Sequence, residues 1–167
     1  MKQKINYIQI IFHLIVTYFL TFSFQSFAWL HNARIIELTE TYGVENFAHN
    51  HEKYNVSVQE IALFTFWPHV ACLLGILLAF ILSITISIVK KWSILNSFVV
   101  LLISYILYRF DILSWKYSKS FLSVDRFIDD YQTIFILNGS LLLIIGLVIF
   151  FSKWTNRLIQ NQYQERN

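Results

Sequence analysis

Polar side chains recur at every fourth position in the first apolar stretch of the chain. Because four residues make about one helical turn, this spacing places them on one helix face, which we expect to meet protein or water and not lipid. The pattern predicts hydrogen bonds to neighbouring helices. The alternative interpretation is that the stripe lines a path or site for protons, ions or a small polar ligand, with a histidine as its titratable member. The polar stripe consists of His13, Thr17, Thr21 and Gln25.

Charged, aromatic and amide residues are expected to meet near one end of the apolar stretches. Arg109 and Asp111 are two positions apart in one predicted helix, so they do not share a face and each needs another partner. One interpretation is a polar binding site. The other is that Arg109 reaches the lipid headgroups while the remaining side chains join helices. The predicted outer polar cluster comprises His31, His69, Tyr105, Tyr108, Arg109, Asp111 and Asn138.

Five histidines raise the question of a metal or a haem. No two of them are four residues apart, and only His31 and His69 are expected at the similar depth that two haem-ligating imidazoles need. The chain also lacks the Gly-x-Ser-x-Gly and His-Glu-x-x-His motifs of hydrolases. We therefore predict no catalytic residue, no cofactor and no metal. The weak metal-ligating candidates are His31, His49, His51 and His69.

Small side chains follow an unbroken four-residue spacing through the second apolar stretch. Small residues let two helix backbones come close, and dispersion with weak interhelical hydrogen bonds then holds the helices together in lipid. The pattern predicts packing against another helix of the same chain, or alternatively a face for self-association. The packing stripe consists of Ala71, Gly75, Ala79, Ser83 and Ser87.

These residues are carried by four apolar stretches, 5–30, 67–89, 92–113 and 131–151, each long enough to cross a bilayer core of about 30 Å. Hydrophobic residues make up 56% of the chain and charged residues 14%, which is too little charge to coat a water-soluble globule. The single cysteine, Cys72, allows no disulfide within the chain. The predicted fold is all-α: one integral-membrane, antiparallel four-helix domain over 1–167 with short extracytoplasmic helical extensions. Outer loops are expected at 31–66 and 114–130, and a basic tail at 152–167.

Basic residues are concentrated on one side of the membrane that the four predicted helices cross. Lys90 and Lys91 occupy the turn between the second and third stretches, and other cations precede the first stretch or follow the fourth. The positive-inside rule therefore places both termini and this turn in the cytoplasm. Cations that flank apolar stretches do not indicate nucleic acid. In the tail, Trp154, Leu158 and Ile159 are expected on the inner headgroups or at a solvated helix end. The predicted location is the cell membrane, and the composition favours a bacterial inner membrane.

The first stretch is expected to be a retained helix. A basic start and a small-x-small motif at 26–28 resemble a signal peptide, but the uncharged run is much longer than a signal core of about 7–15 residues. Apolar spacing extends this helix past Leu30 to Tyr42, where Gly43 predicts a stop in the left-handed conformation. A mobile loop is expected over 43–56.

The second helix has its own start signal. Ser57 and Glu60 have the spacing of a capping box, and Pro68 predicts a kink further along. Ser123 predicts another helix start, ahead of the fourth stretch.

The function predicted from these patterns is that of a non-enzymatic multi-pass membrane protein. It would act by association with another membrane protein or with itself, as an accessory, regulatory, assembly, immunity or defence subunit. The packing stripe and the lack of catalytic motifs favour this interpretation. Two alternatives stay open: an oligomeric pore or transport component that conducts ions, protons or a small polar solute, and a membrane redox or metal-binding protein. The small-molecule ligand, if there is one, is not indicated.

Overall fold

The computed structural model describes residues 5–113, 128 and 130–165, and this part of the chain contains helices and no strand. The elements differ greatly in length, from one turn to nearly nine turns. In chain order they are α1 (Tyr7–Leu30), α2 (Ala33–Tyr42), α3 (Val44–Asn50), the 3-10 helix η1 (His51–Tyr54), α4 (Val58–Val89), α5 (Ile94–Arg109), α7 (Tyr131–Phe151) and α8 (Lys153–Glu165).

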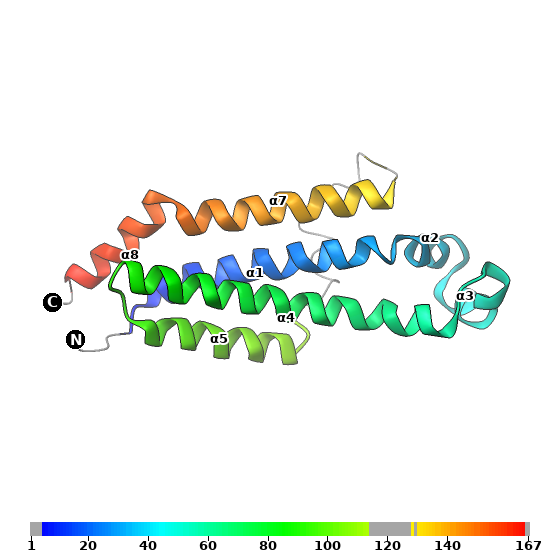
Figure 1. Cartoon of the computed structure of the whole chain (residues 1–167), viewed down its shortest axis with the longest axis horizontal. Coiled ribbons are helices and arrows are strands. Elements are labelled where there is room, and N and C mark those ends of the chain that lie inside the picture. The colour runs from blue at the N-terminus through cyan, green and yellow to red at the C-terminus, as the bar shows by residue number, and fades with distance from the viewer. Residues whose placement is uncertain (1–4, 114–127, 129, 166–167) are drawn as a thin grey trace.

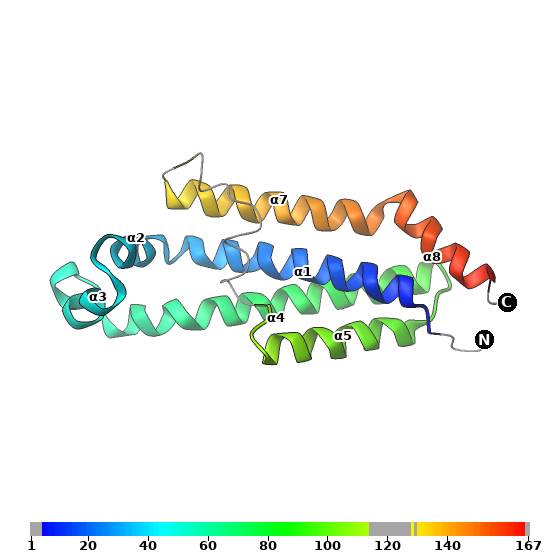
Figure 2. The ribbon, with the colours of Figure 1, turned by 180° about the vertical axis from the view of Figure 1, so that it is seen from behind.

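The long helices lie side by side, with α1 between α4 and α7 and with α5 against α4 (Figures 1 and 2). The start of α1, the α4–α5 turn and α8 lie at one end of the molecule, which we call the terminal end. The helices α2 and α3 lie at the opposite end. α1 is the central helix, because over half of its most apolar 18-residue segment is buried, against about a third for α4 and for α7.

Three helices of the described chain are long and apolar enough to cross a membrane: α1, α4 and α7. The stretch predicted at 92–113 forms only the 16-residue helix α5, which is shorter than a spanning helix usually is. α5 ends early because Phe110 leaves the helical conformation and Asp111 adopts a positive φ of 56°. The last four residues of the predicted stretch, 110–113, form a turn.

The predicted capping box at the start of α4 is confirmed. The Ser57 hydroxyl accepts from the Glu60 N–H at 3.2 Å, and the Glu60 carboxylate accepts from the Ser57 N–H at 2.7 Å. From there α4 continues for 32 residues as one helix, with Pro68 inside it. At 1.5 Å per residue it is about 48 Å long, which exceeds the apolar core of a bilayer by about 18 Å.

The segment between α1 and α4 differs from the prediction in two ways. A turn at His31 and Asn32 separates α1 from α2, although α2 does end at Tyr42 as expected. Gly43 has a positive φ of 80° with an extended ψ of 147°, so it stops the helix without adopting the left-handed helical conformation. The loop predicted over 43–56 is replaced by α3 and η1. We call residues 33–57 the cap.

The cap is helical because its apolar side chains form a small buried cluster, against which side chains at the start of α4 also pack. Phe47 of α3 and Val56 are buried against Ile35 of α2. Two polar contacts close the same segment: Arg34 donates to the Tyr54 carbonyl at 2.8 Å, and the Nδ1 of His51 lies 2.8 Å from the Val56 carbonyl oxygen. These tertiary contacts have no counterpart in the local sequence pattern.

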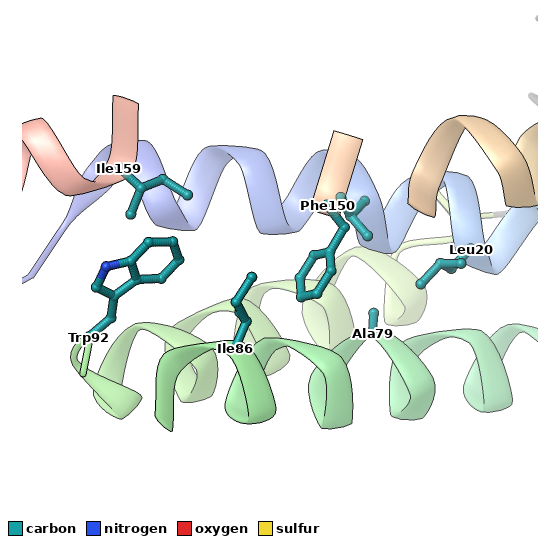
Figure 3. Close-up of a cluster of buried hydrophobic side chains, with 7 residues drawn as sticks. Leu20, Ala79, Ile86, Trp92, Phe150 and Ile159 are labelled. Carbon is teal, nitrogen blue, oxygen red and sulfur yellow. The ribbon is translucent and has the colours of Figure 1, made fainter. Parts of the chain in front are cut away.

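At the terminal end, α8 packs against the long helices. Ile159 of α8 is buried beside Trp92, and the same cluster continues along α4, α7 and α1 through Ile86, Ala79, Phe150 and Leu20 (Figure 3). Trp154 is 65% exposed, whereas Ile159 is 1% exposed, so the tail docks on protein through its Ile159 face. The helix start predicted at Ser123 lies outside the described residues.

Candidate functional site

The packing stripe of α4 faces α1. All five of its residues are buried, and four of them have neighbours on α1. The closest approach is at Gly75, where an added Cβ would lie 2.6 Å from the Thr21 Cα and 3.1 Å from the Leu20 carbonyl oxygen. Such distances require glycine, because no larger residue fits against a neighbouring backbone. The stripe is therefore used within the protomer and is not exposed to a second copy.

The polar stripe of α1 is also buried, and its side chains are hydrogen-bonded. The Nδ1 of His13 lies 2.6 Å from the Ser83 hydroxyl of α4, which joins the two stripes directly. The hydroxyls of Thr17 and Thr21 donate to carbonyls of their own helix, one turn back. Gln25 donates to the Leu113 carbonyl at 2.9 Å. Each of the four side chains is thus satisfied by protein, as buried polar groups must be.

A larger polar cluster lies nearer the terminal end. The Tyr163 hydroxyl of α8 donates to the side-chain Oε1 of Gln9 at 2.8 Å and accepts from the side-chain amide of Asn96 at 2.9 Å. Asn96 also donates to Gln9 at 2.8 Å, and Gln9 donates to Ser87 at 2.9 Å. The three side chains of α1, α5 and α8 form a closed triangle of hydrogen bonds.

This triangle connects to the polar stripe through serine hydroxyls. Ser87 lies 3.3 Å from Ser97, and Ser83 donates to Ser97 at 2.7 Å. Since Ser83 contacts His13, one connected set of side chains runs from α8 to the second turn of α1. We call this set the Tyr163 network. Its members are Gln9, His13, Ser83, Ser87, Asn96, Ser97 and Tyr163.

Backbone groups strengthen the attachment of α8. The Tyr163 hydroxyl accepts from the Ser93 N–H at 2.9 Å, Gln162 accepts from the Ile8 N–H, and Asn6 donates to the Ile159 carbonyl, both at 3.1 Å. Burial raises the pKa of Tyr163, although its hydrogen bonds from Ser93 and Asn96 oppose this shift. The phenol is therefore neutral at physiological pH, as its donated bond to Gln9 requires.

The sequence pattern identified only part of this network. Gln9 stands four residues before His13, so the spacing of the polar stripe extends to it, and this was the available signal. Asn96 and Ser97 are polar residues inside an apolar stretch. Tyr163 lies 67 or more positions away from its partners on α1 and α5, and no local pattern indicates that α8 folds back.

The residues of the predicted outer polar cluster are spread over different surroundings. Asn138 is buried and donates to Ser26 of α1 at 3.0 Å. His69 of α4 and Tyr108 of α5 bring their rings together, with centroids 6.0 Å apart, and Tyr105 adjoins Tyr108. The structure thus gathers these three aromatic rings. The remaining members, His31, Arg109 and Asp111, are exposed.

Within the described ranges, no group of three or more His, Cys, Asp or Glu side chains is arranged to hold a metal ion. His31, His49 and His69 are exposed, and the Nδ1 of His51 is engaged with Val56. Cys72 is buried, and its thiol donates to the Leu113 carbonyl at 3.6 Å. These residues offer no assembled cofactor site.

No protein-family model, curated protein or solved structure matches the chain. Its class therefore rests on its own geometry. In the described residues, that geometry is all-helical, with three helices apolar enough to span a membrane, a buried polar network and a helical cap that has a small buried cluster.

Proposed function

We propose that the chain is an integral membrane protein in which α1, α4, α5 and α7 form an antiparallel four-helix bundle, with both termini in the cytoplasm. Exposed apolar side chains along the outer faces support this proposal, because such surfaces need lipid around them. Lys90, Lys153 and Arg157 gather at the terminal end, and the positive-inside rule expects such cations on the cytoplasmic side. The outward residues include Leu74, Leu77, Ile81, Leu102, Ile144 and Val148.

Within this bundle, the proposed function is non-enzymatic binding of a partner protein through the cap. The observation that carries it is the buried cluster of Ile35, Phe47 and Val56, which folds the cap against the start of α4. Val44 and Val58, at the starts of α3 and α4, are 71% and 70% exposed. These two valines leave apolar surface at the cap that a partner protein can contact.

The partner contact is separate from the packing stripe. Because Gly75 and its neighbours on α4 are covered by α1, a second copy cannot use that face without opening the bundle. Association through the cap leaves the bundle as an anchor that fixes the height and orientation of the cap above the membrane.

Membrane insertion is tested by cysteine labelling of intact cells. In a Cys72→Ser background, Val44→Cys in the cap should react with a membrane-impermeant maleimide, and Lys90→Cys should react only after permeabilisation. The opposite pattern would reverse the orientation. Extraction of the protein by alkaline carbonate would contradict insertion altogether.

Partner binding is tested by photo-crosslinking in the same cells. A photoreactive amino acid at Val44 in the cap, or at Val58 directly after it, should give one discrete adduct, whereas the same group at the lipid-facing Leu77 should not. An adduct of twice the protomer mass identifies self-association. Equal patterns from cap and lipid-facing positions would contradict a cap-specific partner.

A conduit is the second candidate, and the Tyr163 network favours it. The network provides a connected path of hydrogen-bonding groups from α8 to His13. Beyond His13, however, Thr17 and Thr21 bond to their own helix, so the path needs a rearrangement to continue. Purified protein in liposomes tests this function: proton or ion flux that Ser83→Ala abolishes supports a conduit, and flux no greater than in empty liposomes contradicts it.

A further inference from the structure

The terminal end contains an open pocket of about 480 Å³ between the α4–α5 turn and the first turns of α8. Lys90 follows the end of α4, and Lys153 is the first residue of α8. Arg157 is one helical turn further along α8, on the same face as Lys153. Asn156 and Gln160 complete the polar part of the lining.

The pocket concentrates positive charge. Lys90, Lys153 and Arg157 line it together, and no acidic side chain is among its described lining residues. Like charges one helical turn apart repel each other, and Lys90 adds a third cation from a separate element. A cluster of this kind is stabilised when an anion occupies it.

The position of the pocket indicates what kind of anion would fit it. It adjoins the ends of α4 at Val89 and α7 at Phe151, where apolar helices give way to polar sequence. Phe151 lines the pocket and is 61% exposed, so the same opening offers both cations and an apolar surface. One and two turns before Phe151 on α7, Val148 and Ile144 are also exposed, and this row of apolar side chains is suited to an acyl chain.

We propose that this pocket binds the phosphate of an anionic phospholipid, with Lys90, Lys153 and Arg157 around the headgroup and the acyl chains along α7. The inference rests on the proposed membrane insertion, which places the pocket at headgroup level. Juxtamembrane lysine and arginine residues attract anionic lipid, and a preformed pocket adds selectivity to that attraction. Trp92 supports the shape of the pocket, because its indole N–H donates to Gln160 at 2.8 Å.

The test uses the full chain purified in a neutral detergent. Native mass spectrometry should show retained phosphatidylglycerol in preference to phosphatidylcholine when both are added at equal concentration. A Lys153→Gln/Arg157→Gln double variant should bind phosphatidylglycerol about 30-fold more weakly, because each cation near a headgroup contributes roughly a factor of five. Lys53→Gln, which removes an exposed lysine of the cap, is the matched control and should bind as the wild type does.

Three results would overturn the proposal. The first is equal retention of the two lipids. The second is an equal loss, or no loss, in the double variant and the control, with circular dichroism establishing that both are folded. The third is thermal stabilisation by inorganic phosphate that equals the effect of phosphatidylglycerol, since the ligand would then be a soluble anion. Failure of membrane insertion is detected separately, by carbonate extraction.

Discussion

Gly75 of α4 lies directly against the backbone of Thr21 of α1, where an added Cβ would come within 2.6 Å of the Thr21 Cα. This contact brings the two helices close enough for the Ser83 hydroxyl to reach His13 two turns away. The packing stripe and the polar stripe therefore depend on the same small separation between α1 and α4.

Gly75→Ala is expected to destabilise the protein by about 1–3 kcal/mol, because the new methyl group must push a neighbouring backbone away. Thermal unfolding in detergent measures this change. Gly139→Ala is the matched control, since its methyl group would meet the ring of Phe27, a partly exposed side chain that can move. Equal losses in the two variants would show that helix separation at Gly75 does not limit stability.

Tyr163→Phe is expected to loosen α8, because it leaves the Ser93 N–H without its acceptor and breaks the bond to Gln9. Each lost hydrogen bond of this kind costs about 1 kcal/mol, so the open state of α8 should become at least roughly five-fold more populated. Hydrogen exchange of the α8 amides measures it. Tyr105→Phe changes an exposed tyrosine in the second half of α5 and should leave α8 unchanged.

Local patterns predicted those parts of the fold that depend on a single helix. The capping box at Ser57 and the helix end at Tyr42 follow from short-range rules, and the structure contains both. The helix expected over the apolar stretch at 92–113 is longer than α5, because apolar composition alone does not show where a turn interrupts the helix. The positive φ of Asp111 ends the helical path there, although the residues around it are apolar.

The remaining differences arise from contacts between distant segments. The cap forms α3 and η1 because Phe47 and Val56 pack against Ile35. The local sequence of the cap is polar, so its pattern does not predict this buried cluster. The Tyr163 network likewise joins residues more than 60 positions apart. Spacing within one helix identified His13 and Ser83 separately, but only the structure shows that they touch.

The first turn of α7 is expected to depend on pH through Asp130. Hydrogen bonds from the Thr133 hydroxyl and from the Thr133 N–H, the latter at 2.8 Å, lower the pKa of this carboxyl below its ordinary value of 3.8. Because the folded pKa is the lower one, the stabilisation is fully present above the ordinary value and is lost as the pH falls through the folded pKa. Hydrogen exchange of the amides at 133–135 should therefore accelerate more below pH 3.8 than the intrinsic rates predict.

Asp130→Asn separates this capping effect from a general effect of acid. Asparagine also caps helices well, so the variant should keep the first turn of α7 near neutral pH. It carries no carboxyl at this position, so the extra acceleration in acid should disappear. Acceleration of the same size in the variant would assign the pH dependence to other groups.

Phe47→Ala should unfold the cap while leaving the long helices intact, because Phe47 is 4% exposed and the core it shares with Ile35 and Val56 is small. Truncating a buried phenylalanine costs about 3–5 kcal/mol, which is more than a core of this size is expected to supply. Limited proteolysis should cleave the variant within 43–57 much faster than the wild type, with the thermal transition of the apolar helices unchanged. Val44→Ala, at a 71% exposed position of the same helix, should resist the protease as the wild type does. If the apolar helices melt together with the cap in Phe47→Ala, the cap is not a separate folding unit, and the proposal that the helices serve it as an independent anchor is wrong.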